Sequence, residues 1–149
     1  MENSIVRSIE LKAPVSRVWE ALTDHLQFGE WFLVSIDGPF RVGQVSTGRV
    51  TYPGYEHLPW HVVIEAMDAE SYFAYRWYPC TWGADPDYSK EPTTLVEFRL
   101  EPTQTGTRLR VAESGFSDLP SDCNPQEAFR NNTRGWEEQV RNIEAYLDA

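Results

Sequence analysis

The sequence predicts an α+β fold in which a curved antiparallel β-sheet wraps around a long C-terminal α-helix. Two observations carry this prediction. Segments between residues 60 and 114 alternate apolar and polar side chains with a period of two, the pattern of antiparallel strands. The last part of the chain carries an apolar stripe at helical spacing, and a helix of about 24 residues spans roughly 36 Å, enough to cross a whole sheet.

The N-terminal part predicts one strand followed by two short helices. The strand is predicted over SIVRSIELKA, where alternate apolar side chains share a face that Arg7 interrupts. A helix follows in APVSRVWEALTD, where Pro14 suits the first helical position and apolar side chains recur at helical spacing. HLQFGEWFL then predicts a second short helix.

Five further segments predict the rest of the sheet. Residues 44–52 are predicted to form a strand bracketed by glycines and a proline. WHVVIEAMD and ESYFAYRWYP predict neighbouring antiparallel strands, rich in β-branched and aromatic residues. TLVEFRLEP and GTRLRVAESGF, joined by the turn TQTG, predict a hairpin.

The final helix is predicted to begin at CNPQE. Asn124 can cap it, Pro125 takes the first position, and Glu127 stands where a capping box needs it. The apolar stripe that follows consists of Trp136, Val140, Ile143 and Leu147. The sequence has no internal repeat, low-complexity tract or linker, so we expect a single domain over residues 1–149.

Composition restricts the partners. A formal net charge of −10 and a pI near 4.7 argue against nucleic acid and anionic membrane, since both attract basic patches. No segment has the length needed to span a bilayer, and no basic region precedes an apolar stretch at the N-terminus, so we expect a cytoplasmic protein without membrane insertion. In that compartment Cys80 and Cys123 are expected to be reduced.

Three pieces of the chain resemble a known superfamily. IELKAPVSRVWEALTD, FRLEPTQTGTRLRVAESGF and GWEEQVRNIEAYLDA, in this order and at these distances, resemble the START-like or polyketide-cyclase-like superfamily (SRPBCC). Within it they are most similar to the branch named after the activator of heat-shock-protein ATPase. The resemblance covers nearly the full length and implies a helix-grip fold with a ligand cavity between the long helix and the sheet. It also places a Gly-Trp pair where Gly135 and Trp136 stand.

Motifs for metal, cofactor or covalent chemistry are lacking. His57 and His61 have a metal-like spacing, but Pro59 and the strand-like alternation after it argue against a helical metal site. Cys80 could be a nucleophile, but no base is evident beside it. No Gly-rich phosphate loop, nucleophile elbow or HExxH motif occurs, so we expect no metal and no cofactor.

Glu113 ends the apolar face of its predicted strand, which Leu109 and Val111 begin. One interpretation buries it unpaired beside the cavity, where its pKa would rise until the carboxyl was neutral and could act as a general acid. The other lets the strand bend near Gly115 and sends Glu113 to the surface or against an arginine such as Arg49, Arg76 or Arg99. We favour the second, with Glu113 at the strand end near the cavity mouth.

A ligand cavity is a stronger candidate site than a catalytic Glu113. Its inward side chains either line a pocket or simply fill the core, and the sequence leaves both readings open. Gly135 costs about 1 kcal/mol relative to alanine inside a helix, so the close approach of another backbone or of a ligand would explain it. The candidate ligand-binding residues are Phe73, Tyr75, Trp77, Val96, Phe98, Leu100, Val111, Glu113, Trp136 and Val140.

Two loops are candidate lids. PCTWGADPDYSKEP, residues 79–92, is long for a hairpin and contains Trp82. SGFSDLPSDCNP, before the final helix, offers Phe116 and Leu119 as possible plugs. The alternative for both is irregular surface with anchoring side chains.

Three functions compete. The leading hypothesis is binding of a small hydrophobic or amphipathic molecule, such as a lipid, polyketide or aromatic metabolite. The second is a cyclase- or hydrolase-like enzyme in which Glu113, Tyr75 or His61 supplies acid or base. The third, which the resemblance suggests, is a co-chaperone-like module with a chaperone as partner. The separate N-terminal domain of the eukaryotic activators has no counterpart in this sequence, which disfavours ATPase activation.

Overall fold

A computed structural model describes residues 3–77, 93–119 and 125–148 of the chain. Within these ranges, seven strands form one antiparallel sheet in the order β1-β7-β6-β5-β4-β3-β2. The strands are β1 Ser4–Leu11, β2 Val34–Ile36, β3 Val45–Val50, β4 Pro59–Asp68, β5 Tyr72–Trp77, β6 Thr94–Pro102 and β7 Thr107–Ser114. The helices are α1 Val15–Thr23, α2 His25–Phe32 and α3 Pro125–Asp148, with a short 3-10 turn η1 at Phe116–Asp118.

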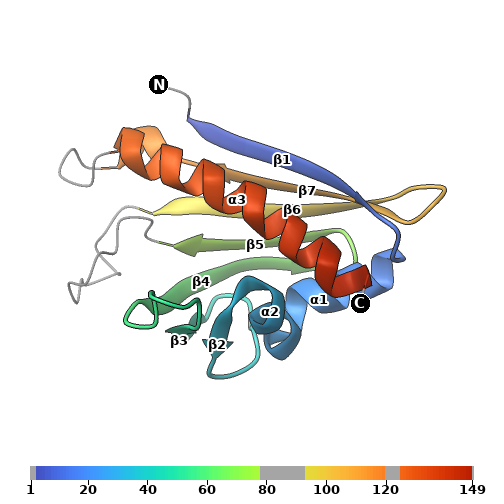
Figure 1. Ribbon diagram of the computed structural model, residues 1–149, viewed down its shortest axis with the longest axis horizontal. Coiled ribbons are helices and arrows are strands. Elements are labelled where there is room, and N and C mark those ends of the chain that lie inside the picture. The colour runs from blue at the N-terminus through green and yellow to red at the C-terminus, as the bar shows by residue number, and fades with distance from the viewer. Residues whose placement is uncertain (1–2, 78–92, 120–124, 149) are drawn as a thin grey trace.

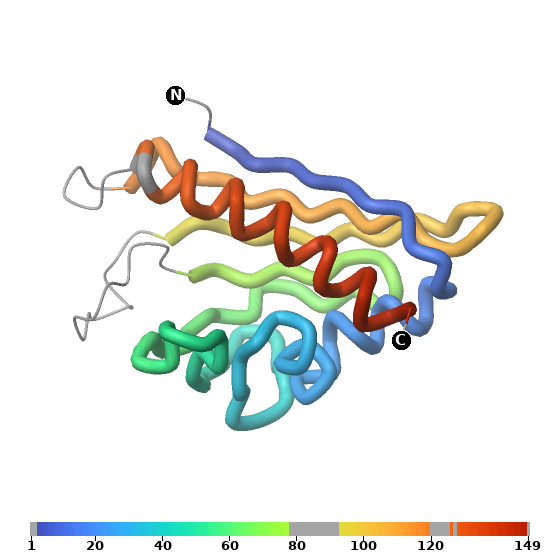
Figure 2. Tube along the Cα trace, viewed as in Figure 1, coloured from blue at the N-terminus to red at the C-terminus, as the bar shows by residue number. Residues whose placement is uncertain are grey.

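The predicted α+β architecture is confirmed. Figure 1 shows α3 running diagonally across one face of the curved sheet, with α1 and α2 near its C-terminal end. The trace in Figure 2 shows that β1 and β7 lie side by side although they come from opposite ends of the chain, and their pairing joins Leu11 to Thr107 and Ser4 to Ser114. The sheet therefore provides one concave face that α3 covers.

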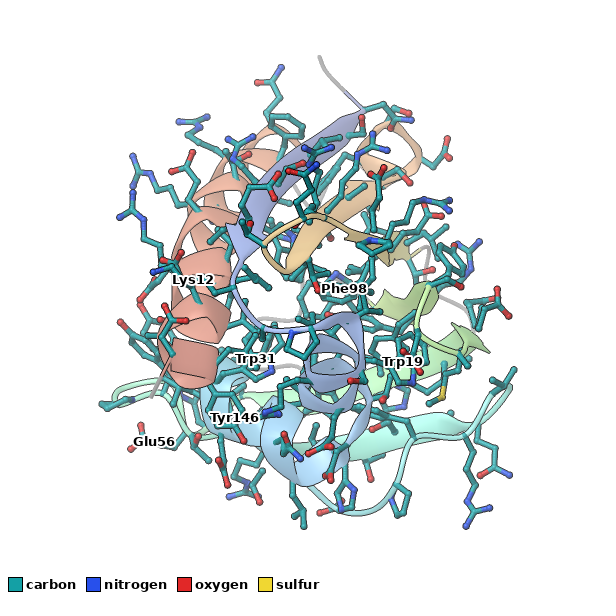
Figure 3. The ribbon with its side chains drawn as sticks, turned by 90° about the vertical axis from the view of Figure 1, so that its right-hand side faces the viewer. Lys12, Trp19, Trp31, Glu56, Phe98 and Tyr146 are labelled. Atoms are coloured by element: carbon teal, nitrogen blue, oxygen red, sulfur yellow. The ribbon has the colours of Figure 1, made fainter. Side chains whose placement is uncertain are left out.

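The interior between α3 and the sheet is filled by side chains. Trp31 and Phe98, labelled in Figure 3, are both buried there. A small gap in this region is too narrow to admit a water molecule. It is lined by Trp31, Phe98, Leu109, Val111, Trp136, Gln139, Val140 and Ile143. Over this part of α3, the aromatic and aliphatic residues of the sheet form a packed core.

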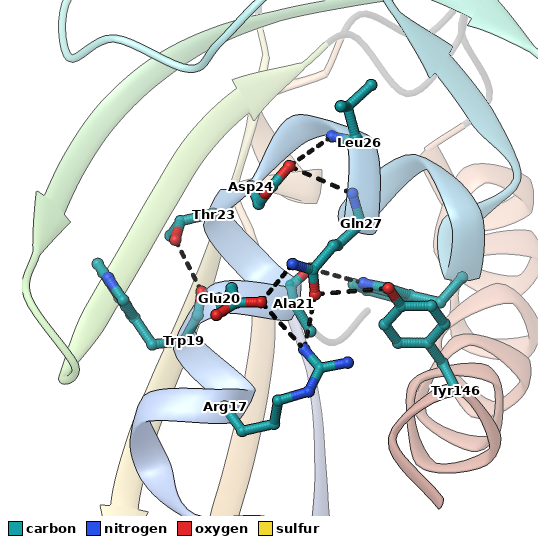
Figure 4. Close-up of polar contacts among 10 residues, drawn as sticks. Arg17, Trp19, Glu20, Ala21, Thr23, Asp24, Leu26, Gln27 and Tyr146 are labelled. Carbon is teal, nitrogen blue, oxygen red and sulfur yellow. Dashed lines mark hydrogen bonds and ion pairs between the residues drawn. The ribbon is translucent and has the colours of Figure 1, made fainter. Parts of the chain in front are cut away.

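A polar corner fixes α2 between α1 and α3 (Figure 4). Asp24 caps α2, since its carboxylate accepts from two backbone N–H groups of the first turn at 2.9 and 3.4 Å. Arg17 of α1 donates to the side-chain oxygen of Gln27 at 2.6 Å, and the hydroxyl of Tyr146 on α3 donates to the same oxygen at 3.4 Å. This corner anchors the first turn of α2, and at the other end of the helix the carbonyl of Phe32 accepts from the side chain of Gln139 on α3 at 3.2 Å.

The observed elements differ from the predicted ones in small ways. The sequence pattern does not predict β2, because three residues are too few for an alternation to be visible. Pro14 precedes α1 as its cap instead of occupying the first helical position. The helix α3 begins at Pro125 as predicted. Asn124 and the side chain of Glu127, the other predicted capping residues, lie outside the described part of the chain.

Candidate functional site

Glu113 is completely buried, so the prediction that it reaches the surface is wrong. The strand β7 continues to Ser114, and Glu113 is paired in register with Ile5 on β1 and Val96 on β6. The chain does bend at Gly115, which has a φ of 103°, but this bend follows the strand and leaves Glu113 on the inner face.

The arginines proposed as partners of Glu113 lie elsewhere. Arg76 is exposed and bonds Glu65 at 2.8 Å, and Arg99 is exposed and bonds Glu97 at 3.2 Å. Arg49 is exposed on β3, near the far edge of the sheet from β7. In the described ranges, no cationic side chain forms an ion pair with Glu113.

Uncharged donors from three elements bind the Glu113 carboxyl instead. Oε2 accepts from the indole N–H of Trp77 on β5 at 2.7 Å and from the Thr94 hydroxyl on β6 at 2.5 Å. Oε1 accepts from the indole N–H of Trp136 on α3 at 2.9 Å. The amide Nδ2 of Asn132, one helical turn before Trp136, lies 3.0 and 3.1 Å from the two oxygens. One carboxyl group thus joins α3 to two strands of the sheet.

Two effects on the pKa of Glu113 oppose each other. Burial raises the pKa of Glu113, while the hydrogen bonds from Thr94, the two indoles and Asn132 lower it, and burial prevails. The indole and amide N–H groups can only donate, which suits the ionised carboxylate. If the carboxyl is neutral, its O–H needs a hydrogen-bond acceptor. Of the four side chains that contact Glu113, only Thr94 contacts it through an atom that can accept a hydrogen bond, the hydroxyl oxygen.

Tyr75 lies in the same row of the sheet, since it pairs with Val96, which pairs in turn with Glu113. Its hydroxyl is buried and, among the described residues, has no hydrogen-bond partner. Burial, followed by the nearby charge of Glu113, raises the pKa of Tyr75 well above its ordinary value. Tyr75 therefore remains a neutral phenol and is a poor candidate for a general base.

A cavity of about 80 Å³ lies directly against the side chains that bind Glu113. It is lined by Phe32, Trp77, Asn132, Gly135, Trp136 and Gln139. The rings of Trp77 and Trp136 stack at 5.8 Å with 29° between their planes, and Phe32 stands 6.2 and 6.1 Å from them. The wall of the cavity is therefore aromatic.

A wider groove of about 400 Å³ adjoins the cavity. It shares with the cavity Phe32, Asn132, Gly135 and Gln139. The other lining residues are Leu33, Val50, Tyr52, Tyr55, Leu58, Asn131, Arg134 and Glu138. Tyr52 and Tyr55 are 40% and 49% exposed, which places aromatic surface beside the groove. The two hollows together form the candidate site.

The structure brings only some of the predicted ligand-binding residues to this site. Trp77 and Trp136 line the cavity, and Glu113 lies behind them. The others are fully or partly buried in the core: Phe73, Tyr75, Val96, Phe98, Leu100, Val111 and Val140. Phe116 and Leu119 are buried, and Phe116 packs against Phe129 at 5.3 Å, whereas Trp82 lies outside the described residues. The role of all these residues in ligand binding stays a prediction.

Sequence reasoning missed several residues of the site. Thr94, Phe32 and the groove tyrosines give no recognisable sequence signal. Asn132 does give one, because it stands one turn before Trp136 and so interrupts the apolar stripe of α3 with a polar group.

The remaining candidates for chemistry lie elsewhere. His61 is half-buried on β4, and burial lowers its pKa, while His57 is exposed. Across residues 3–77, 93–119 and 125–148, no group of three His, Cys, Asp or Glu side chains is placed to hold a metal ion. None of the helices in these ranges is long and apolar enough to cross a membrane. Cys80 and Cys123 lie outside the described residues.

Gly135 is not explained by the close approach of another backbone. A Cβ at this position would meet no described atom of a neighbouring element within 4 Å, whereas a Cβ at Gly29 in α2 would collide with the carbonyl oxygen of Val34. Because Gly135 lines both hollows, the missing side chain leaves room where a ligand could lie.

The two helical glycines predict opposite effects of one substitution. Gly135→Ala should raise the free energy of unfolding by about 0.5–1 kcal/mol through helix propensity. Gly29→Ala should lower it by about 1–3 kcal/mol, because overpacking outweighs the same gain. Urea denaturation of both variants measures the difference. Destabilisation by Gly135→Ala would show that space at this position is needed for the fold itself.

Comparison with known proteins identifies the family and the fold. The model of the family described as activator of Hsp90 ATPase homolog 1-like protein matches residues 12–148. No protein of curated function matches the chain significantly. Among solved structures, the MLL2253 protein of Mesorhizobium loti is 25% identical with a TM-score of 0.75, and the match covers 97% of this chain and 96% of that one.

Two further structures share the fold. DynU16, a protein of the dynemicin biosynthetic locus, is 21% identical with a TM-score of 0.78, covering all of this chain, which spans 48% of DynU16. CalU16 from Micromonospora echinospora is 21% identical with a TM-score of 0.65, covering 97% of this chain and 73% of that one. The resemblance predicted from the sequence is confirmed, and the chain belongs to the family of activator of Hsp90 ATPase homolog 1-like proteins.

Proposed function

We propose that this protein binds a small aromatic or amphipathic molecule, with a ring in the cavity beside the stacked side chains of Trp77 and Trp136 and the remainder in the adjoining groove. The observation that carries the proposal is the continuity of an aromatic-walled cavity of about 80 Å³ with a groove of about 400 Å³. Apolar, concave sites with few polar groups are typical of small-molecule binding. The interior around Phe98 and Val140 is packed. This favours a binding site beside Asn132, Gly135 and Trp136 of α3 over a cavity that runs along the whole helix.

An enzymatic role receives less support from the same residues. A general acid or base must come within hydrogen-bond reach of its substrate. Glu113 is the best-placed titratable group, but it has no exposed surface, and both of its oxygens already accept hydrogen bonds from Trp77, Thr94, Asn132 or Trp136. Binding without chemistry is therefore the simpler function. The co-chaperone role stays a prediction.

The proposal predicts which indole signals respond to ligand. NMR titration with a panel of small aromatics, fatty acids and short polyketides should shift the indole N–H resonances of Trp77 and Trp136. The indoles of Trp31 and Trp60, which bond the carbonyl of Ala21 and the hydroxyl of Ser46, are internal controls and should stay still.

A matched pair of variants tests the location. Gly135→Leu should fill the cavity and abolish the shifts, because the space beside Gly135 is open. Ala145→Leu places the same side chain on an exposed position of α3 away from the groove and should leave binding unchanged. The proposal fails if no resonance moves at millimolar ligand, or if Gly135→Leu binds as well as the wild type.

A further inference from the structure

Two polar side chains, Asn132 and Gln139, line the cavity, and they differ in which of their amide atoms already have hydrogen-bond partners. The amide of Gln139 is engaged at both ends, since Nε2 donates to the carbonyl of Phe32 at 3.2 Å and Oε1 accepts from Asn142 at 3.0 Å. The amide nitrogen of Asn132 is engaged by Glu113. Its carbonyl Oδ1 accepts no hydrogen bond from any described residue. Some polar atoms without a partner are buried, but Asn132 Oδ1 is not one of these buried atoms.

Glu113 fixes the orientation of the Asn132 amide. Nδ2 lies 3.0 and 3.1 Å from the two carboxyl oxygens, and each of those oxygens also accepts an indole N–H. Turning the amide over would place its oxygen against two oxygens that are acting as acceptors, which is repulsive. In a planar amide, the oxygen then points away from Glu113, and Asn132 lines both the cavity and the groove.

Most donors around the cavity already have an acceptor within the protein. The indole N–H groups of Trp77 and Trp136 both point to Glu113, and the amide of Gln139 donates to a backbone carbonyl. A ligand carbonyl, ether or carboxylate in the cavity would have to use the second N–H of the Gln139 amide, whose nitrogen already donates to Phe32. A ligand hydroxyl or ring N–H would find an acceptor to which no described residue donates, Oδ1 of Asn132.

We infer that the cavity selects flat aromatic ligands that carry a hydrogen-bond donor, with Asn132 Oδ1 accepting from that donor and Glu113 acting as the residue that positions Asn132. This inference rests on the proposed function and narrows its ligand class. It also assigns a role to the buried carboxyl that requires no contact between Glu113 and the ligand.

Three ring systems of almost equal shape test the inference. Indole carries an N–H donor, indene carries a CH₂ group at the same position, and benzofuran carries an acceptor oxygen. Isothermal titration calorimetry on the wild-type protein should show indole binding about fivefold to tenfold more tightly than either analogue, the worth of one hydrogen bond made without loss elsewhere. Benzofuran binding as tightly as indole would overturn the inference.

A variant assigns the preference to Asn132. Asn132→Leu replaces the amide with an apolar side chain of similar size and should reduce the indole-to-indene affinity ratio to about one. Asn131→Ala, at a neighbouring exposed asparagine that lines only the groove, is the matched control and should keep the wild-type ratio. A preserved ratio in folded Asn132→Leu would overturn the assignment, and if that variant does not fold, the three ligands on the wild type still decide.

The outcomes separate this inference from the proposed function. Equal binding of all three ring systems, with shifts at Trp77 and Trp136, overturns the donor preference and leaves the binding site intact. Absence of binding by all three, and by the wider ligand panel, overturns both.

Discussion

Replacing Glu113 with alanine should lower the free energy of unfolding by about 3–5 kcal/mol. The substitution leaves the donors of Trp77, Thr94, Asn132 and Trp136 without their acceptor. Leaving buried donors unsatisfied costs more than forming their hydrogen bonds gains, because the groups have already lost their water. Urea denaturation followed by circular dichroism measures the loss.

Glu101→Ala is the matched control for Glu113→Ala. Glu101 lies on the neighbouring strand β6, is exposed, and touches Arg108 only at 3.7 Å. Its removal should leave the unfolding curve almost unchanged, since exposed ion pairs contribute little. If the two alanine variants were equally stable, the hydrogen bonds to Glu113 would have to be replaced by water at no cost, and the carboxyl would not hold α3 to the sheet.

The second large effect is a dependence of stability on pH with the opposite sign to that of most acidic residues. The folded state raises the pKa of Glu113 above its ordinary value of 4.5. Above about pH 4.5 the unfolded chain releases this proton while the folded protein keeps it, so the folded state binds more protons. The contribution of Glu113 to stability is therefore full below that pH and is lost as the pH rises to the folded pKa.

Comparison with Glu113→Gln isolates this contribution, because the other titrating groups are common to both proteins. Glutamine keeps the shape but sets an amide N–H₂ against an indole N–H, so the variant should be less stable than the wild type in acid. The deficit should shrink as the pH rises above about 4.5, by up to about 1.4 kcal/mol per pH unit. Urea denaturation of both proteins at a series of pH values measures it.

The sign of the pH dependence is the decisive observation. A deficit that grows with pH would mean that the donors outweigh burial and hold the pKa of Glu113 below its ordinary value. A deficit that does not change would mean that Glu113 has the same pKa in both states. Either result would contradict the raised pKa and would favour the carboxylate as the state bound by the two indoles.

Much of the fold could be predicted from the sequence because its signals are local. The alternation in Phe73, Tyr75 and Trp77, and the one that runs from Leu109 to Glu113, identifies strands and their inner faces without knowledge of the neighbours. The stripe through Trp136 and Ile143 identifies the face of α3 that packs on the sheet.

The site was harder to predict because it is built from contacts between distant residues. The pattern alone places Glu113 on the inner face, and a carboxylate there is costly unless it is bound. The donors that bind it stand at positions 77, 94, 132 and 136, and the register between β5, β6 and β7 decides that they meet. Local turn propensity at Gly115 therefore pointed to the wrong side of the sheet for Glu113.

The pairing of β1 with β7 has a consequence for the rate of folding. The paired residues lie roughly a hundred positions apart, so their contact closes a long loop at a large entropic cost before it gains any hydrogen bond. The hairpin of β6 and β7 closes a short loop and can form early. We therefore expect β1 to join the sheet late and the protein to fold slowly for its length, with the free edge of β7 exposed to association with other chains until β1 covers it.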